Sequence, residues 1–394
     1  MIYLDNSSTT RQFDEVTDLI YDISKNSFGN PSSLHSYGFE AANTVSDARK
    51  KLLHNFYNDG KVIFTSGGTE SDNTALISMC HKMKRRGNKV ITTKIEHPAI
   101  LETCRRLEEE GFEVCRLDVD KNGYLDPQAV KNELDDNTLL VSIMAVNNEV
   151  GTIEPVLPVY TMIQDYNKRN GKNIIFHTDA VQAFGKLEFT EAPFDLISVS
   201  SHKIHGPKGI GALYIRNGIQ IPPYISGGGQ EEGYRSGTEN VPGIAGFGLA
   251  AEISYRDFKQ KQKKMSELND YLRQGIMDSV PDVLLNGCEE MGFSLSDCGK
   301  RCPSILNLSF LGTRGEVILH TLEQDGIFVS TGSACSSHKN GDSHVLSSMS
   351  LNHKEIEGAI RFSLSEDNTK EEMDFVIEKV TNAVKGFRKL GSFR

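Results

Sequence analysis

Seven short segments rich in apolar, β-forming residues recur between residues 62 and 215, and stretches with a helical pattern separate most of them. The helical stretches include 71–86, 100–110 and 158–169. The segments expected to be strands are 62–65, 90–93, 113–117, 139–145, 174–177, 196–199 and 212–215. Alternation of this kind places helices against a mainly parallel sheet. The sequence therefore predicts an α/β fold whose larger domain contains a mainly parallel, seven-stranded sheet.

Polar residues follow five of these segments at the point where each strand is expected to end. The clusters are 66–71, 96–98, 147–149, 179–182 and 200–203. The carboxyl ends of parallel strands share one edge of an open sheet, and ligands bind in the crevice at that edge. Clusters that lie far apart in the sequence should therefore meet in one place, and we expect the functional site there.

The alternation weakens after Gly237, which indicates a second, smaller unit. Residues 241–280 have the pattern of one or two long helices that would bridge two domains. Residues 368–390 are expected to form an amphipathic helix that Thr369 and Glu372 could begin with a capping box. Further strands are expected at 305–310, 326–330 and 360–364. The expected division is a large domain, 13–252, and a smaller α/β domain made of 1–12 and 253–394.

The composition argues against several classes of protein. The formal net charge of -10 at pH 7 disfavours nucleic acid or an anionic membrane as the main partner. No apolar stretch approaches the roughly 18 residues that would span a bilayer. The chain begins as a strand, without the basic and apolar regions of a signal peptide. We therefore expect a cytoplasmic protein that binds neither nucleic acid nor membrane.

The cysteines and acidic residues give no sign of a disulfide framework or a metal site. There are 7 cysteines, an odd number, and no pair has CxxC spacing. Residues 118–123 (DVDKNG) begin like a calcium-binding loop, but Ala129 stands where the twelfth position needs a glutamate. A β-turn before a helix is the better interpretation, and we expect no metal.

Residues 198–211 (SVSSHKIHGPKGIG) contain a reactive candidate side chain. The polar group 200–203 comes directly after an expected strand, and the glycines and proline that follow prevent a helix from starting. Lys203, beside tight backbone, can be partly desolvated, which lowers the pKa of its amine and lets the neutral form condense with an aldehyde. Taken alone, however, the segment is more typical of a surface loop with two ordinary lysines.

A second segment favours a functional role for Lys203. Residues 67–69 (GGT) open onto a helix, where free backbone N–H groups and the helix dipole favour a phosphate. Together with Lys203 they supply two groups that could bind pyridoxal phosphate: backbone donors for its phosphate and an amine for its aldehyde. This cofactor also needs an acid at its ring nitrogen, so that the ring is a strong electron sink, and Asp179 is the best candidate. His97 could stack on the ring and move protons, because histidine titrates nearest neutrality.

Seven motifs appear in order along the chain. They are FTSGGTESDN (64–73), EHPA (96–99), NNEVG (147–151), DAVQ (179–182), SSHKIHGPKG (200–209), RSGTEN (235–240) and STGSAC (330–335). In these motifs, and essentially from end to end, the sequence resembles the cysteine desulfurase family of the class V aminotransferases, whose fold is the pyridoxal-phosphate-dependent transferase fold type I. The resemblance implies pyridoxal 5′-phosphate bound to Lys203 through a Schiff base, L-cysteine as the substrate, and a homodimer.

The resemblance also implies roles for the matching residues. The residues that would hold the cofactor's phosphate are Gly68, Thr69, Ser200 and His202, with Thr238 reaching the phosphate of the partner subunit. Those that would hold its ring are Asp179 at the nitrogen, Asn148 and Gln182 at the phenolic oxygen, and His97 over the face. Arg361 would bind the carboxylate of the substrate, and Asn148 would also contact the substrate.

Cys335 is the residue to which the resemblance assigns the sulfur step. Its surroundings, 330–344, are rich in Gly, Ser and Asn, which predicts a mobile loop. Its thiolate would attack the substrate's sulfur, leaving a persulfide on Cys335 and alanine as the product, and His97 could deprotonate one of the two thiols. The persulfide sulfur would then pass to an acceptor protein, either an iron–sulfur scaffold or a tRNA thiolation enzyme.

Other interpretations stay open. A class V aminotransferase or a selenocysteine lyase would share the fold, but an aminotransferase has no use for Cys335 and needs a keto acid. A non-catalytic sulfur-relay or assembly partner would keep the fold without the chemistry. The intact Lys203, His97, Asp179 and Cys335 argue against it. The sequence departs from the family pattern at 5–10 (DNSSTT) and at Ser201, where we expect tuning of the site and not its loss.

Overall fold

The computed structural model describes residues 1–56, 60–189, 194–331, 342–389 and 391. Its largest sheet has seven strands, in the spatial order β2 (Gly60–Thr65), β8 (Gly211–Arg216), β7 (Leu196–Ser200), β6 (Ile175–Asp179), β5 (Thr138–Ser142), β3 (Lys89–Thr93) and β4 (Glu113–Leu117). The five strands from β7 to β4 run parallel to one another, and β8 is antiparallel to both of its neighbours. The predicted α/β fold with a mainly parallel seven-stranded sheet is confirmed.

The reversed direction of β8 follows from the length of the connection before it. Only residues 201–210 join β7 to β8, whereas a parallel crossover needs a dozen residues or more. The two strands therefore pair antiparallel, with Ser200 opposite Gly211. Because Lys203 belongs to this short connection, it is held close to the carboxyl end of β7.

The strand expected at 139–145 is shorter than predicted. β5 ends at Ser142, yet the chain stays alongside β6: the Ile143 N–H donates to the His177 carbonyl oxygen (3.1 Å) and the Ala145 N–H to that of Asp179 (2.9 Å). The departure from regular pairing therefore occurs where the chain approaches the functional edge of the sheet.

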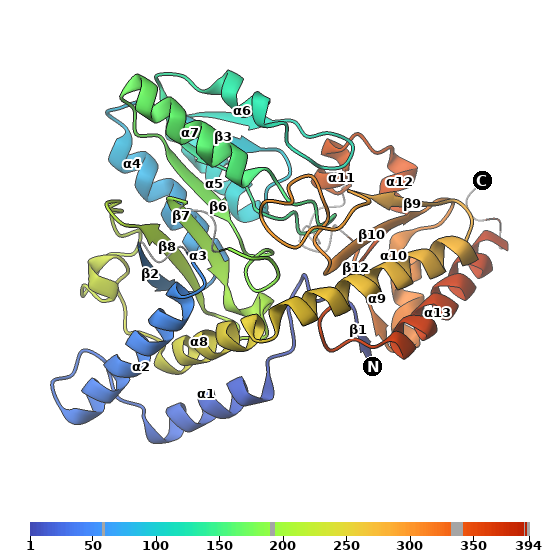
Figure 1. Ribbon diagram of the computed structural model, residues 1–394, viewed down its shortest axis with the longest axis horizontal. Helices are drawn as coiled ribbons and strands as arrows, with labels where there is room; N and C mark the ends of the chain where they lie inside the picture. The colour runs from blue at the N-terminus through green and yellow to red at the C-terminus, as the bar shows by residue number, and fades with distance from the viewer. Residues whose placement is uncertain (57–59, 190–193, 332–341, 390, 392–394) are drawn as a thin grey trace.

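Helices cover both faces of this sheet (Figure 1). One face packs against α2 (Ser36–Leu53), α6 (Pro127–Glu133), α7 (Val156–Asn170) and α8 (Val241–Tyr255), and α1 (Asp14–Asn26) packs on α8. The other packs against α3 (Gly68–Asn73), a π-helical turn (Thr74–Ser78), α4 (Met79–Met83) and α5 (Pro98–Glu109). Neighbouring residues of one strand face opposite cores, as Ile175 and Phe176 do, because successive side chains of a strand alternate in direction.

The smaller part of the molecule has its own sheet and core. The long helix α9 (Phe258–Ser279) runs toward it from the large sheet (Figure 1). Three antiparallel strands form this sheet in the order β12 (Ala359–Ser363), β10 (Ile305–Phe310) and β9 (Val283–Asn286), and a parallel pair joins β1 (Ile2–Tyr3) to β11 (Ile327–Phe328). The helices are α10 (Gly315–Gln324), α11 (His344–Ser348), α12 (His353–Glu357) and α13 (Lys370–Lys389). Sequence analysis did not predict β9.

The start of α13 has the predicted capping box. The Glu372 N–H donates to the Thr369 hydroxyl (3.3 Å), and the Thr369 N–H donates to the Glu372 carboxylate (3.2 Å). These two bonds satisfy backbone donors that have no partner within the helix. The helix is thereby fixed where its apolar face, including Met373 and Val376, meets the core of the smaller part.

The first ten residues connect the two parts of the molecule. The Ser7 N–H donates to the Ser363 hydroxyl (2.9 Å), on β12 of the small sheet. The Thr10 N–H donates to the His202 carbonyl oxygen (2.9 Å), in the loop after β7. Residues 5–10 therefore pass between the two sheets, beside the loop that contains Lys203.

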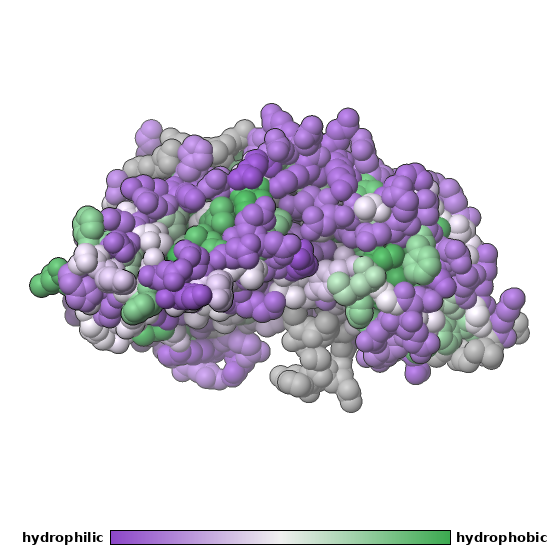
Figure 2. Space-filling view, turned by 90° about the horizontal axis from the view of Figure 1, so that it is seen from below, coloured by the Kyte–Doolittle hydropathy of each residue, from purple (hydrophilic) through white to green (hydrophobic). Residues whose placement is uncertain are grey.

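Within the described ranges, each helix is too short or too polar to cross a bilayer. Figure 2 shows one face on which hydrophilic residues predominate and hydrophobic residues form several small areas.

Candidate functional site

A cavity of about 260 Å³ lies at the carboxyl ends of the parallel strands. It is lined by Ser7, Ser8, Gly68, Thr69, Asp72, His97, Met144, Val146, Asn148, Asp179, Val181, Gln182, Ser200, His202, Lys203 and Arg361. Apart from Thr238 and Cys335, all of the predicted site residues are among them. Thr238 is exposed and does not line the cavity. Cys335 lies outside the described residues.

Lys203 ends a 3₁₀ turn, Ser201–Lys203, that follows β7 directly. Its Nζ donates to the main-chain oxygens of Ser7 (2.5 Å) and Ser8 (2.8 Å). Two carbonyl groups of the N-terminal segment thus hold the amine at the cavity wall. Sequence analysis did not anticipate this contact, because the partners are about 195 positions apart.

The start of α3 forms a narrow cradle at the cavity. A Cβ atom on Gly68 would lie 2.8 Å from Cγ2 of Val181, so no side chain fits at this position without a shift of its neighbours. Ser200 and His202 line the cavity with it, and the His202 Nδ1 is 3.2 Å from the Thr9 hydroxyl. The backbone at the start of α3 can therefore approach a phosphate closely, as the sequence predicts.

Two buried carboxyl groups form another part of the wall. Burial raises the pKa of Asp179 to about 6, against the opposing effect of Lys203. Asp72, on α3, is 1% exposed, and burial together with Asp179 raises its pKa well above the usual range. The Asp72 Oδ1 has no hydrogen-bond partner among the described residues. This pair suits a ligand that brings a protonated ring nitrogen.

Asp72 was missed by the sequence analysis, although it lies within the quoted motif FTSGGTESDN. Its neighbour His177 is fully buried. The His177 ring nitrogens lie 2.9 Å from the hydroxyls of Ser142 and Ser198, and burial lowers the pKa of the imidazole to about 3. A neutral His177 therefore does not neutralise Asp72, even though Nε2 is 3.6 Å from Oδ1.

His97 is the N-cap residue of α5, and its Nδ1 accepts a hydrogen bond from the Ala99 N–H (3.1 Å). A neutral imidazole that accepts at Nδ1 has its proton on Nε2. Burial, reinforced by Lys203 and His344, lowers the pKa of His97 to about 4. The imidazole is thus neutral at pH 7, whereas the sequence analysis expected it to titrate near neutrality. The cause is desolvation, which a sequence pattern does not report.

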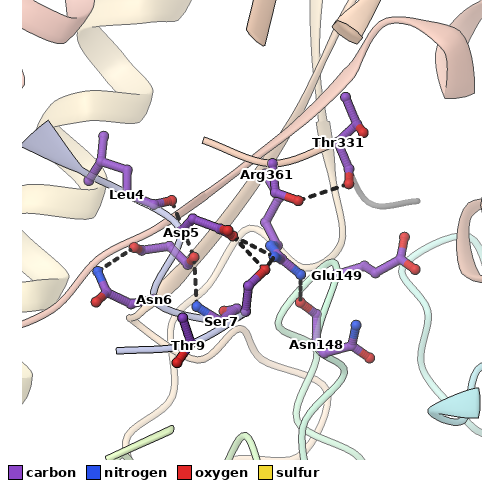
Figure 3. Close-up of polar contacts among 12 residues, drawn as sticks. Leu4, Asp5, Asn6, Ser7, Thr9, Asn148, Glu149, Thr331 and Arg361 are labelled. Atoms are coloured by element: carbon purple, nitrogen blue, oxygen red, sulfur yellow. Dashed lines mark hydrogen bonds and ion pairs between the residues drawn. The ribbon is translucent and has the colours of Figure 1, made fainter. Parts of the chain in front are cut away.

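Arg361, on β12, reaches the cavity from the smaller part of the molecule (Figure 3). Its Nη1 donates to the Asn148 carbonyl oxygen (2.9 Å), and its Nη2 donates to Asp5 Oδ1 and to the Ser8 hydroxyl (both 2.8 Å). Its Nε has no hydrogen-bond partner among the described residues. The guanidinium therefore retains a donor for a carboxylate ligand.

Two buried glutamates connect the cavity wall to residues 343–344. The Ser343 hydroxyl donates to the Glu149 carboxylate (2.6 Å), and His344 Nε2 lies 2.9 Å from the Glu96 carbonyl oxygen. Burial raises the pKa of Glu149 to about 7 and that of Glu96 to about 8. These contacts bring the chain just after the STGSAC segment to the edge of the cavity.

Comparison with known proteins identifies the family. The model of the family described as Aminotransferase class-V matches residues 2–376. The chain belongs to this family.

Relatives that match this chain over nearly its full length are cysteine desulfurases. It is 42% identical over 392 residues to the cysteine desulfurase IscS of Clostridium botulinum, covering 99% of this chain and 96% of the relative. It is 40% identical over 396 residues to that of Dictyoglomus turgidum, covering 100% and 97%. The recognised resemblance to cysteine desulfurases is confirmed.

Solved structures agree with this fold. A NifS-like protein superposes with a TM-score of 0.88 at 37% identity, over 98% of this chain and 99% of that chain. A NifS-like protein from Rickettsia africae superposes with a TM-score of 0.84 at 28% identity, over 98% and 99%. Class-V aminotransferases are pyridoxal-phosphate-dependent enzymes, and the cavity offers the donor set that this cofactor requires.

Proposed function

We propose that the protein is a cysteine desulfurase, which removes sulfur from L-cysteine, releases L-alanine and keeps the sulfur as a persulfide on Cys335. One observation carries the proposal: Lys203, Asp179 and His97 line one cavity with the Gly68 cradle. The similarity to cysteine desulfurases over the full length of the chain supports the same activity. The proposed substrate, L-cysteine, is taken from those relatives.

The residues present fit pyridoxal phosphate. Lys203 would hold its aldehyde carbon, and its phosphate would contact Gly68, Thr69, Ser200 and His202. Asp179 would face the ring nitrogen, His97 the ring face, and Asn148 and Gln182 the phenolic oxygen. When bound, the cofactor supplies an electron sink that stabilises negative charge on the α-carbon of the substrate.

Lys203 is proposed to move the protons of the reaction. In the structure its Nζ donates hydrogen bonds to the Ser7 and Ser8 carbonyl oxygens at the cavity wall. When the substrate amine takes its place, the released amine stays within reach of these carbonyls and can accept a proton from the α-carbon. His97, neutral at pH 7, presents Nε2 to the same cavity and can donate a hydrogen bond there.

Arg361 is proposed to bind the carboxylate of L-cysteine. Its side chain is 3% exposed, and its Nε is without a partner among the described residues. An arginine fork can pair with a carboxylate through two hydrogen bonds, which fixes direction as well as distance. The contact would orient the substrate with its amine toward Lys203.

Cys335 is proposed to take the sulfur. Its thiolate would form an S–S bond with the substrate sulfur while the carbon–sulfur bond breaks, and the electron pair of that bond passes to the substrate carbon, which is then protonated. The product is alanine, and the sulfur stays on Cys335 until an acceptor protein, an iron–sulfur scaffold or a tRNA thiolation enzyme, removes it. The compartment would be the cytoplasm.

A homodimer is also part of the proposal. Large hydrophobic side chains are exposed on and near α1 and α2: Tyr21, Phe28, Leu34, Tyr37 and Phe39. A monomer rarely leaves such a group uncovered. Thr238 is exposed and outside the cavity of its own chain, as expected if it reaches the phosphate in the partner subunit.

The deciding experiment is mass spectrometry of the cofactor-loaded protein after treatment with L-cysteine. We expect one added sulfur on Cys335, and release of alanine without any keto acid. Cys335→Ser should keep the colour of the cofactor and lose sulfide release, whereas Cys298→Ser should keep both. Full sulfide release by Cys335→Ser would refute the role of Cys335, and a strict need for a keto acid would refute the desulfurase assignment in favour of an aminotransferase.

A further inference from the structure

A buried lysine, Lys186, lies behind the cavity and has no role in the proposed chemistry. It is 8% exposed, and its Nζ donates to Oε1 of Gln182 (2.9 Å), which lines the cavity. Burying an amine is costly unless it is paired. The position of Lys186, one turn after Gln182, therefore calls for an explanation.

The contacts of Gln182 define which end of its amide faces which neighbour. Lysine offers only donors when charged, so the atom that meets Lys186 must be the amide oxygen. At the other end, the amide nitrogen donates to the Ser7 carbonyl oxygen (2.8 Å), which can only accept. Both partners thus require the same orientation, and the second hydrogen of the nitrogen stays available.

Lys186 is itself fixed by its main chain. Its N–H donates to the Ala183 carbonyl oxygen (3.0 Å), and its carbonyl oxygen accepts from Nε2 of Gln262 (2.8 Å), on α9. The main chain at Lys186 is therefore held by contacts that do not involve Gln182, and its amine is a donor against which the amide is oriented.

Charged groups from several elements surround this lysine. Burial lowers the pKa of Lys186 to about 8; Arg361 on β12 acts in the same direction, and Cys302 and Glu366 oppose it. The cavity itself contains His97, Asp72, Asp179, Lys203 and His202. Even when it is neutral, the amine retains two hydrogens and still donates to the amide oxygen.

We propose that Lys186 is a positioning residue that acts through Gln182: with the Ser7 carbonyl it holds the amide so that an N–H, and not the oxygen, is offered to the phenolic oxygen of the cofactor. This inference rests on the proposed function. A hydrogen-bond donor favours the deprotonated phenolic oxygen. Without it, the proton shared between this oxygen and Lys203 is retained to higher pH.

The test is a pH titration of the visible absorption band of the cofactor-loaded protein. Lys186→Met should raise the midpoint by about one pH unit and weaken cofactor binding about tenfold, which is the same free-energy change. Lys208→Met is the matched control: Lys208, like Lys186, lowers the pKa of His202, but it is exposed. It should shift the midpoint by less than about 0.3 unit.

A double variant tests whether Lys186 acts through the amide. If it does, Lys186→Met combined with Gln182→Met should have the midpoint of Gln182→Met alone, within about 0.3 unit. Additive shifts would show that Lys186 acts independently of Gln182. That result, or a midpoint for Lys186→Met equal to the wild type, would overturn the inference.

Further variants keep the test decisive if Lys186→Met does not fold. Gln182→Glu keeps the shape and presents only acceptors, so it should raise the midpoint by more than about one unit. An unchanged midpoint in Gln182→Glu would also overturn the inference. A wild-type protein that takes up no pyridoxal phosphate would instead refute the proposed function, which separates the two failures.

Discussion

Nη2 of Arg361 lies 2.8 Å from Oδ1 of Asp5, although the two residues are 356 positions apart in the sequence. The proposed receptor for the substrate carboxylate thus already faces a carboxylate of its own chain. Asp5 is held in place by its bridge to Ser363 and by the Ser8 hydroxyl, which donates to the same oxygen (2.7 Å). An incoming L-cysteine must share the guanidinium with Asp5 or displace it.

Asp5→Asn should therefore lower KM for L-cysteine. The amide cannot compete as an anion, and the loss of a partly exposed ion pair is worth about threefold in binding. The kcat should stay near that of the wild type. Asp14→Asn, which removes the surface pair with Arg11, is the control and should leave KM unchanged. A higher KM in Asp5→Asn would show instead that Asp5 is needed to hold Arg361.

His97 should remain neutral well below pH 6.5, because burial lowers its pKa to about 4. NMR of protein with labelled histidines can test this directly. The His97 resonance should not shift between pH 8 and pH 5. A His97 midpoint near 6.5 would contradict the buried, neutral imidazole.

The cofactor-free protein should lose stability as the pH rises, in part through Glu149. Burial raises the pKa of this carboxyl from 4.5 to about 7, so its stabilising contribution is complete below pH 4.5 and is lost as the pH rises to 7. The change corresponds to about 3 kcal/mol. Glu149→Gln should flatten the dependence of the free energy of unfolding on pH by this amount.

Denaturant unfolding at pH 5, 6, 7 and 8 measures the effect of Glu149→Gln. The exposed Glu102, paired with Arg105 on α5, provides the control, and Glu102→Gln should keep the pH dependence of the wild type. Equal slopes for wild type and Glu149→Gln would mean that Glu149 is ionised in the folded protein at neutral pH.

Gly68→Ala should weaken the binding of pyridoxal phosphate about tenfold, since the new Cβ would meet Cγ2 of Val181 at 2.8 Å and move the cradle. Binding measured by absorption should recover in the double variant Gly68→Ala, Val181→Ala, which makes room. Gly386→Ala, where a Cβ meets nothing within 4 Å, should bind normally. Failure of the double variant to recover would mean that backbone flexibility, and not space, requires a glycine.

Much of the fold could be predicted from local patterns. Apolar runs such as 62–65 and 196–199 became β2 and β7, and the capping box of Thr369 began α13. β9 was missed; it has only four residues, and Leu284 in it is 39% exposed. The early end of β5 at Ser142 was also not predicted.

The candidate site could be predicted where it consists of residues at the carboxyl ends of strands, such as Asp179 and Ser200. Asp72 was missed because it lies inside a helix, and its importance comes from its burial next to Asp179. The state of His97 was also predicted incorrectly. A residue type sets the ordinary pKa of a side chain, but only its surroundings set the shift.

The sequence by itself determined the order of strands and helices, the family, and the residue types that gather at one edge of the sheet, because these depend on short-range patterns and ordered motifs. The tertiary structure alone decided which groups meet. It places the Ser7 carbonyl against both Lys203 and Gln182, and Lys186 behind that amide. Two of these contacts join residues 175 and 196 positions apart, and the third depends on burial. Neither the distance nor the loss of water is encoded in any local pattern.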